Sequence, residues 1–187
     1  SRSSAASDVY KRQTGDIDVV SAVQPQFFAD LEKTPGIRLI RQTPFSAGYN
    51  CFDFNLREGP FKDKPLLRKA IARAINREVI NKNAYFGIGE VDCSLIPLKH
   101  WCYTKLPCDQ IWYNLDEAAK LLKEAGGEGL TFECITHTAD AFSQRAPEII
   151  QEDLKKIGVT MKITAVDFSL YVKDYWVPKK GDALIAG

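Results

Sequence analysis

The sequence lacks several features that would fix a compartment or a partner. No stretch approaches the roughly 20 apolar residues that span a membrane, and no apolar segment of a secretory signal peptide stands at its start. It contains no long run of one charge sign. Its 25 basic and 24 acidic side chains nearly cancel, so the charge gives no reason to expect binding to nucleic acid.

What remains is the composition of an ordinary globular protein. The chain has 187 residues, of which 45% are apolar and 26% charged. That length is enough for one domain with a real hydrophobic core.

The two ends of the chain look unlike the middle. Residues 1–14 are poor in apolar side chains and show no periodicity, which indicates a non-native leader before about Thr14 or Gly15. The last five residues, 183–187, form an apolar run that predicts a core strand. Natural domains rarely end in a strand that nothing covers, so we interpret the chain as a fragment and expect this strand to lack cover.

Cysteine usage leaves two interpretations open. The odd total of five leaves at least one thiol free. Three of them lie within 16 residues, and in an oxidising compartment a disulfide could form among Cys93, Cys102 and Cys108. In a reducing compartment the same three, with His100, could hold zinc, although the spacing differs from the paired C-x2-C of ordinary zinc modules.

The most informative segment runs from residue 49 to residue 80. An aromatic-rich strand ends at Asn55, and Gly59 with Pro60 makes a turn. Asp63 is a candidate cap for a helix whose first turn accepts Pro65. The apolar face of that helix has helical spacing: Leu67, Ala70, Ile71, Ala74 and Ile75. Asn76 then predicts the cap of a second short helix through Ile80.

The flanking segments predict further elements. Before residue 49 we expect short strands over 15–23 and 36–42, with a short helix over 25–33 between them. After it, Asn114 with Glu117 forms a capping box for a helix that Gly126 ends.

The last third of the chain alternates between strands and helices. We expect strands over 130–136, 159–166 and 182–186. The helix over 142–157 should start near Ser143 or Gln144, because Pro147 fits only a first turn, and Asp167 caps a helix through about Tyr175. This β-α-β-α-β order favours a mainly parallel sheet with helices on its faces.

Two blocks of sequence resemble the extracellular solute-binding proteins of family 5, the peptide-, dipeptide- and nickel-binding components of bacterial ABC importers. The first block matches the family's Phe-Asn, Pro-Phe-x-Asp and Arg-x-Ala-x-x-x-Ala-Ile-Asn-Arg-Glu pattern at Phe54, Asn55, Pro60, Phe61, Asp63, Arg68, Ala70, Ala74, Ile75, Asn76, Arg77 and Glu78. The second matches at Tyr113, Ala119, Lys120, Leu121, Leu122, Glu124, Ala125 and Gly126. The resemblance covers about residues 15–187.

The resemblance implies an α/β fold: an incomplete lobe like that of type II periplasmic binding proteins, with a mixed, mostly parallel sheet and flanking helices. Residues 15–47 would end lobe I and residues 48–187 would form most of lobe II, truncated at the C-terminus. It implies a monomeric binding protein that is not an enzyme and needs no cofactor. Such a protein captures peptides or similar solutes in the periplasm, or outside the cell on a lipid anchor, and delivers them to the permease subunits.

Ligand-binding residues are expected at the carboxyl ends of strands, where α/β lobes present polar groups. The first group follows the strand at 130–136 and consists of Thr136, His137, Thr138, Phe142 and Arg145. The resemblance places His137 near the basic side chain that meets a peptide carboxylate, and a histidine there would make the capture pH-dependent. The alternative is that His137 is an exposed loop residue and Arg145 a solvated helix charge.

The second expected group is Tyr49, Asn50 and Phe52, on the strand where the family crosses between lobes. Successive side chains of a strand point to opposite faces, so only every second residue can face a ligand. The alternative is that Phe52 lies in the core. A competing hypothesis from another class is a cytosolic α/β enzyme or zinc protein. It would use either the cysteine cluster with His100 or a pair formed by Cys134 and His137.

Overall fold

The computed structural model describes residues 11, 14–15, 17–20, 23–40, 49–94, 96, 98, 100–105 and 112–186. The backbone separates into two units, Ser1–Arg41 and Gln42–Gly187. No helix among the described residues has both the length and the apolar character needed to cross a bilayer.

The described part of the first unit contains little regular structure. A 3₁₀ turn, η1 (Pro25–Phe27), leads into the short helix α2 (Phe28–Leu31), which agrees with the helix expected over 25–33. The strands expected over 15–23 and 36–42 are absent from the described parts of those segments. Ile40 is 74% exposed, and a strand forms only where a neighbour accepts its backbone hydrogen bonds.

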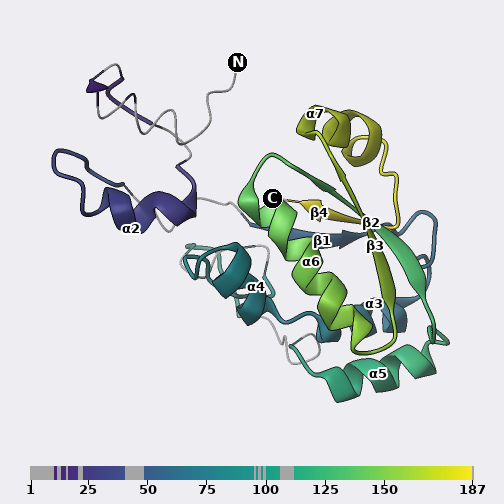
Figure 1. Cartoon of the computed structure of the whole chain (residues 1–187). Helices are drawn as coiled ribbons and strands as arrows, with labels where there is room; N and C mark the ends of the chain where they lie inside the picture. The colour runs from purple at the N-terminus through teal and green to yellow at the C-terminus, as the bar shows by residue number, and fades with distance from the viewer. Residues whose placement is uncertain are drawn as a thin grey trace. The chain divides into compact units, whose positions relative to one another are not determined.

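A four-stranded sheet organises the second unit, in the order β1-β4-β2-β3 (Figure 1). Its strands are β1 (Cys51–Phe54), β2 (Thr131–His137), β3 (Thr160–Val166) and β4 (Ala183–Ala186). β2 pairs in parallel with both β3 and β4, whereas β1 runs antiparallel to β4 at the edge. The predicted mixed, mostly parallel sheet is confirmed.

The apolar run at the end of the sequence is covered. β4 lies between β1 and β2 in the sheet, and all four of its residues are buried. The expectation that this strand lacks cover is therefore wrong. Its position explains its composition, because a central parallel strand is buried on both faces and needs no alternation.

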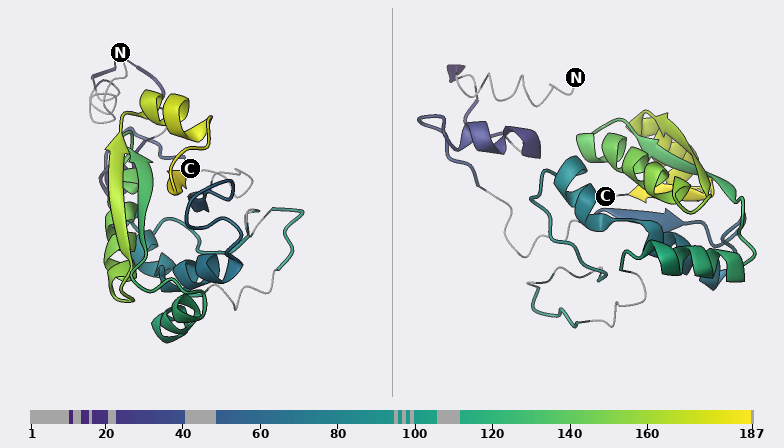
Figure 2. Two further views of the ribbon diagram at one scale, coloured as in Figure 1. Left: turned by 90° about the vertical axis from the view of Figure 1, so that its right-hand side faces the viewer. Right: turned by 60° about the horizontal axis from the view of Figure 1, so that its bottom comes forward.

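One face of the sheet carries the main core. Helices α3 (Pro65–Ala74), α4 (Arg77–Ala84), α5 (Leu115–Glu124) and α6 (Ala141–Lys155) supply its helical part, and α6 packs along β2 and β3 (Figures 1 and 2). Four phenylalanine rings meet edge to face at its centre, with centroids 4.8 to 6.4 Å apart: Phe52, Phe54, Phe61 and Phe132.

The opposite face is covered by a single irregular helical segment, α7 (Phe168–Leu170) followed by the π-helix η2 (Tyr171–Trp176). The buried apolar residues on this side of the sheet are Ile135, Leu184 and Tyr171. The alternation along β2 decides which residue faces which side, since Phe132 and Cys134 lie in the main core and Ile135 lies under η2.

Two residues of the family pattern hold loops in place through side-chain to backbone hydrogen bonds. The Asn55 side-chain amide donates to the carbonyls of Lys179 and Gly181, at 3.0 and 2.8 Å, and so fixes the turn that enters β4. Arg68 donates to the carbonyl of Phe61 at 2.7 Å. These fixed positions therefore satisfy backbone groups that no regular element would satisfy.

The predicted helix caps are mostly confirmed. Asn76 and Asn114 each accept from the backbone N–H three residues later, and Gly126 takes the left-handed conformation with φ 63°. Asp63 is not a cap: it has φ 54°, and Lys64 stands at the cap position without a side-chain bond. The second short helix runs four residues beyond Ile80, to Ala84.

The helix with Pro147 begins earlier than predicted. α6 starts at Ala141, with Asp140 as its cap, so Pro147 lies inside the helix. A proline there has no N–H for the carbonyl four residues before it. That carbonyl belongs to Ser143, and the buried Thr136 hydroxyl donates to it at 2.5 Å. A side chain on the neighbouring strand thus replaces the missing helical bond, which no local pattern could reveal.

Candidate functional site

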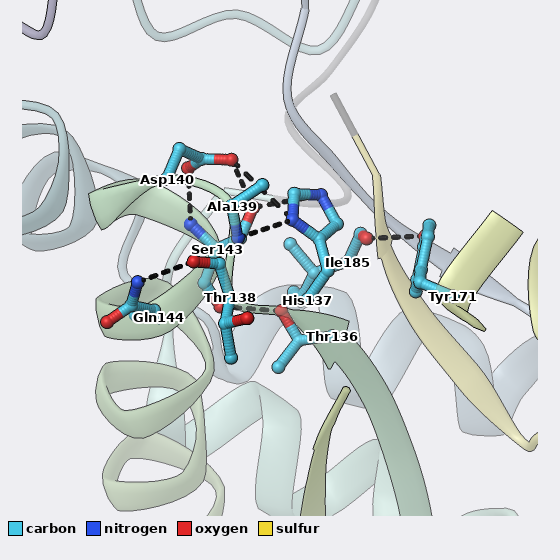
Figure 3. A network of polar contacts seen from close by, with 9 residues as sticks. All are labelled: Thr136, His137, Thr138, Ala139, Asp140, Ser143, Gln144, Tyr171 and Ile185. Atoms are coloured by element: carbon cyan, nitrogen blue, oxygen red, sulfur yellow. Dashed lines mark hydrogen bonds and ion pairs between the residues drawn. The ribbon is translucent and has the colours of Figure 1, made fainter. Parts of the chain in front are cut away.

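The carboxyl end of β2 leads straight into the amino terminus of α6 and holds a closed polar network (Figure 3). Asp140 caps the helix, accepting from the Ser143 N–H at 2.8 Å and from the Ser143 hydroxyl at 2.9 Å. His137 lies between them, with Nε2 3.3 Å from the Ser143 hydroxyl oxygen and Nδ1 3.7 Å from an Asp140 carboxylate oxygen.

The hydrogen bonds define the tautomer of His137. The Ala139 N–H donates to Nδ1 at 3.3 Å, so Nδ1 is the acceptor and the proton sits on Nε2. Nε2–H then donates to the Ser143 hydroxyl, which in turn donates to Asp140. Every polar atom of the ring has a partner within the protein.

Burial favours this neutral form. His137 is 4% exposed, and the rings of Phe168 and Tyr171 pack against it edge to face with centroids 4.9 and 5.0 Å away. Desolvation lowers the pKa of His137 below its usual 6.5, opposed by the nearby Asp140 carboxylate. The alternative in which His137 is an exposed loop residue is therefore wrong, because its ring is buried and bonded within the protein.

The two threonines beside it differ in exposure. Thr136 is buried and bonded to the Ser143 carbonyl. Thr138 is exposed: its N–H donates to the Val166 carbonyl, and its own carbonyl accepts from the Gln144 side chain. The backbone at Thr138 is thereby held, while the residue itself is exposed.

Phe142 and Arg145 face the end of α4 and not His137. The ring of Phe142 packs edge to face on Tyr85, with centroids 5.9 Å apart. The exposed Arg145 guanidinium lies over the ring of Phe86, with its carbon 5.2 Å from the centroid, a cation–π distance. The second contact places an exposed cation over the ring of Phe86.

The second expected group separates in the same way. Tyr49 and Asn50 are exposed ahead of β1, whereas Phe52 packs against Phe54 and Phe132 in the main core. Cys51, of the opposite parity, is half-buried, and burial, with Asp53 beside it, raises the pKa of its thiol to about 12.

The described residues assemble neither the Cys134–His137 pair of the enzyme hypothesis nor a full ligand set for zinc. Cys134 lies in the main core, its pKa raised to about 12 chiefly by burial, while His137 is on the other side of the sheet. Cys93 is disulfide-bonded and cannot supply a thiolate, whereas Cys102 is a free thiol. Cys108 lies outside the described residues, among which no group of three or more metal-ligating side chains occurs.

Sequence reasoning missed the rings that enclose His137. Phe168 and Tyr171 belong to the helix after Asp167. The sequence predicted this helix but assigned it no part in the site. The Tyr171 hydroxyl donates to the Ile185 carbonyl at 2.6 Å, and burial raises the pKa of this phenol. The aromatic spacing of 168, 171, 175 and 176 was the available signal, but it does not say which partner the rings enclose.

The fold and the strand-end loop define an α/β lobe. The model of the family described as "Bacterial extracellular solute-binding proteins, family 5 Middle" matches residues 3–187. The chain belongs to this family, as its sequence motifs predicted.

Proteins that carry out known binding roles are among its relatives. The dipeptide-binding protein of Escherichia coli is 29% identical over 168 residues, 87% of this chain and 31% of that protein. The oligopeptide-binding protein AppA of Bacillus subtilis is 29% identical over 96% of this chain and 35% of its own length. The chain thus spans about a third of the length of these relatives.

Solved structures of related proteins agree with the fold. The binding protein AgaA of Agrobacterium tumefaciens R10 in complex with agropinic acid has a TM-score of 0.83 at 26% identity, covering 98% of this chain and 37% of AgaA. DppA of Helicobacter pylori, in complex with the peptide STSA, has a TM-score of 0.81 at 26% identity, covering 97% of this chain and 34% of DppA.

Proposed function

We propose that the chain is part of the substrate-binding component of an ABC importer. The component would capture peptides or similar small solutes outside the inner membrane and deliver them to the permease subunits. The family match over residues 3–187 carries this proposal. Relatives named as dipeptide-, oligopeptide- and ABC-transporter periplasmic-binding proteins support it.

Periplasmic residence of the parent protein is part of the same proposal. Disulfides persist in the bacterial periplasm and are rare in the cytosol, so the disulfide at Cys93 supports it. Action as a monomer, without a cofactor and without catalysis, is proposed on the same grounds of family and relatives. The division into the end of lobe I (residues 15–47) and most of lobe II (residues 48–187) is retained as a proposal.

Within the lobe, we propose a ligand-contact surface made of Thr138, Phe142 and Arg145, with Tyr49 and Asn50 as further contacts. Thr138 and Arg145 are exposed residues, and their hydroxyl and guanidinium would supply the polar groups. Thr136 and His137 would position this loop and not contact the ligand, because their polar atoms are bonded within the protein. Phe52 is left out of this surface because it packs in the core.

A solute trap of this kind gains affinity from contacts with two lobes at once. We therefore expect one lobe alone to bind peptides more weakly than micromolar, so the test must detect weak contact. Titrating di- to tetrapeptides at millimolar concentration into the isotope-labelled chain should shift the amide resonances of residues 138–145. If calorimetry gave micromolar peptide affinity for this chain, the proposal that it holds only one side of the binding site would be wrong.

Arg145 offers the sharpest variant. Arg145→Ala should abolish the shifts caused by peptides with a free carboxylate, and Arg145→Lys should keep them in part. Lys155→Ala is the matched control, since Lys155 is an exposed cation at the far end of the same helix. If no peptide shifts these resonances, the proposed contact surface is wrong.

A further inference from the structure

A second reactive cluster lies well away from the β2–α6 loop in sequence and takes no part in the proposed function. In the stretch between α4 and α5, the His100 Nδ1 lies 2.9 Å from the Cys102 sulfur. The Cys102 N–H also points to the same nitrogen, at 3.4 Å. Both contacts direct donors at Nδ1, so the imidazole is placed as the proton acceptor for the thiol.

The other free thiols of the described residues are in different surroundings. Cys51 and Cys134 have their pKa raised to about 12, in both cases mainly by burial, which keeps them as inert thiols. Cys102 is only half-buried, and its neighbour Trp101 is 85% exposed. One thiol of three thus has both a base and access to solvent.

We propose that Cys102 and His100 form a nucleophilic thiol site that reacts with low-molecular-weight disulfides. His100 Nδ1 takes the proton from the Cys102 sulfur, which attacks one sulfur of the small disulfide. The S–S bond of the reagent breaks as a new one forms to Cys102, and the second sulfur leaves and takes up the proton from His100. The product is a mixed disulfide on Cys102 and one released thiol, with the small disulfide as the oxidant.

In this stretch a free thiol and a disulfide-bonded cysteine lie close together in sequence. Cys93 is oxidised while Cys102, nine residues later, is free. A thiol assisted by an imidazole exchanges with disulfides faster than an unassisted one. In an oxidising compartment we therefore expect Cys102 to carry a small thiol as a mixed disulfide.

The experiment uses the native chain and an aromatic disulfide reagent that releases a coloured thiol, with a chelator present because imidazole and thiolate also bind metal ions. We expect one thiol to react fast in the native protein. Cys102→Ser should remove the fast reaction, and Cys51→Ser should leave it unchanged. Persistence of the fast reaction in Cys102→Ser would overturn the proposal.

The role of His100 is tested separately. His100→Ala should slow the reaction at neutral pH by about 10-fold, since general-base help contributes at least that much in typical sites, and added imidazole should restore part of the rate. Thr104→Ala, an exposed change two residues from Cys102, is the matched control and should not alter it. A rate within threefold of the native one in His100→Ala, or no effect of imidazole, would show that His100 does not act as the base.

Discussion

The two faces of the sheet in the second unit are built in different ways. One face is closed by four helices and a continuous apolar core around four phenylalanine rings. The other is closed by one short irregular segment whose rings surround a buried histidine. The residues of the first face follow the regular apolar spacing of helices and strands, whereas the second face depends on particular hydrogen bonds. The proposed contact loop lies at the boundary between the two faces.

The largest effect is expected on the helical face. Phe132→Ala should lower the free energy of unfolding by about 3–5 kcal/mol, because it removes a ring that is 2% exposed and contacts two others. Urea unfolding measures this. Leu170→Ala, at a position that is 42% exposed, should change stability by less than about 0.5 kcal/mol. Equal losses at the two positions would contradict the comparison.

The next effect is at the boundary between the faces. Thr136→Val should cost about 1–3 kcal/mol, because it leaves the buried Ser143 carbonyl without a donor. Pro147→Ala restores the helical N–H to that carbonyl, so Thr136→Val should cost less in the Pro147→Ala background. A double-mutant cycle by urea unfolding measures the coupling, and strict additivity would show that the hydroxyl does not replace the missing bond.

A smaller loss is expected on the irregular face. Tyr171→Phe keeps the ring against His137 but removes the hydroxyl that donates to the Ile185 carbonyl. We expect a loss of about 1 kcal/mol in the free energy of unfolding. Tyr175→Phe, on the same helical segment, serves as the control. If the Tyr171 hydroxyl contributes nothing, η2 is held by ring packing alone.

The smallest effect is a dependence on pH. The pKa of His137 is lowered in the folded state, so above about pH 6.5 the residue is neutral in both states and the stabilisation is complete. As pH falls below that value, the unfolded chain takes up a proton before the folded one does, and the free energy of unfolding decreases. Unfolding measured between about pH 5 and pH 7.5 should show this slope.

Substitution separates His137 from the other histidine of the chain. The sequence has two histidines. His137→Gln should remove the slope whatever it does to the absolute stability, while His100→Ala should keep it. A slope that survives unchanged in His137→Gln would assign the pH dependence to other titratable groups, and the burial of His137 would then contribute nothing to it.

The difference between the faces also explains what could be predicted. The helices at 65–74 and 115–124, the helix caps Asn76 and Asn114, and the mixed sheet followed from local spacing and capping patterns. One error fell where a distant group decides, since Pro147 lies inside the helix and Thr136 supplies the missing donor. Asp63 is also not the predicted cap, because it takes φ 54° one residue before the cap position. The strand expected over 36–42 failed in its described part because a strand needs a neighbour.

In the candidate loop, the sequence predicted the position of His137 but not its burial. Its place at the carboxyl end of a parallel strand was predictable, since the alternation of strands and helices sets it. The burial of His137 was not, because it depends on Phe168 and Tyr171, which lie about thirty residues further along the chain.

By itself the sequence determined the family, the order of helices and strands and the loop where polar residues gather, because these depend on motifs and on spacing between near neighbours. Only the tertiary structure decided which of those polar residues remain exposed. Thr138 and Arg145 lie at the surface, while Thr136 and His137 have their hydrogen bonds satisfied inside. The reason is physical: a polar side chain is available to a ligand only if no other part of the folded chain has already bonded and buried it.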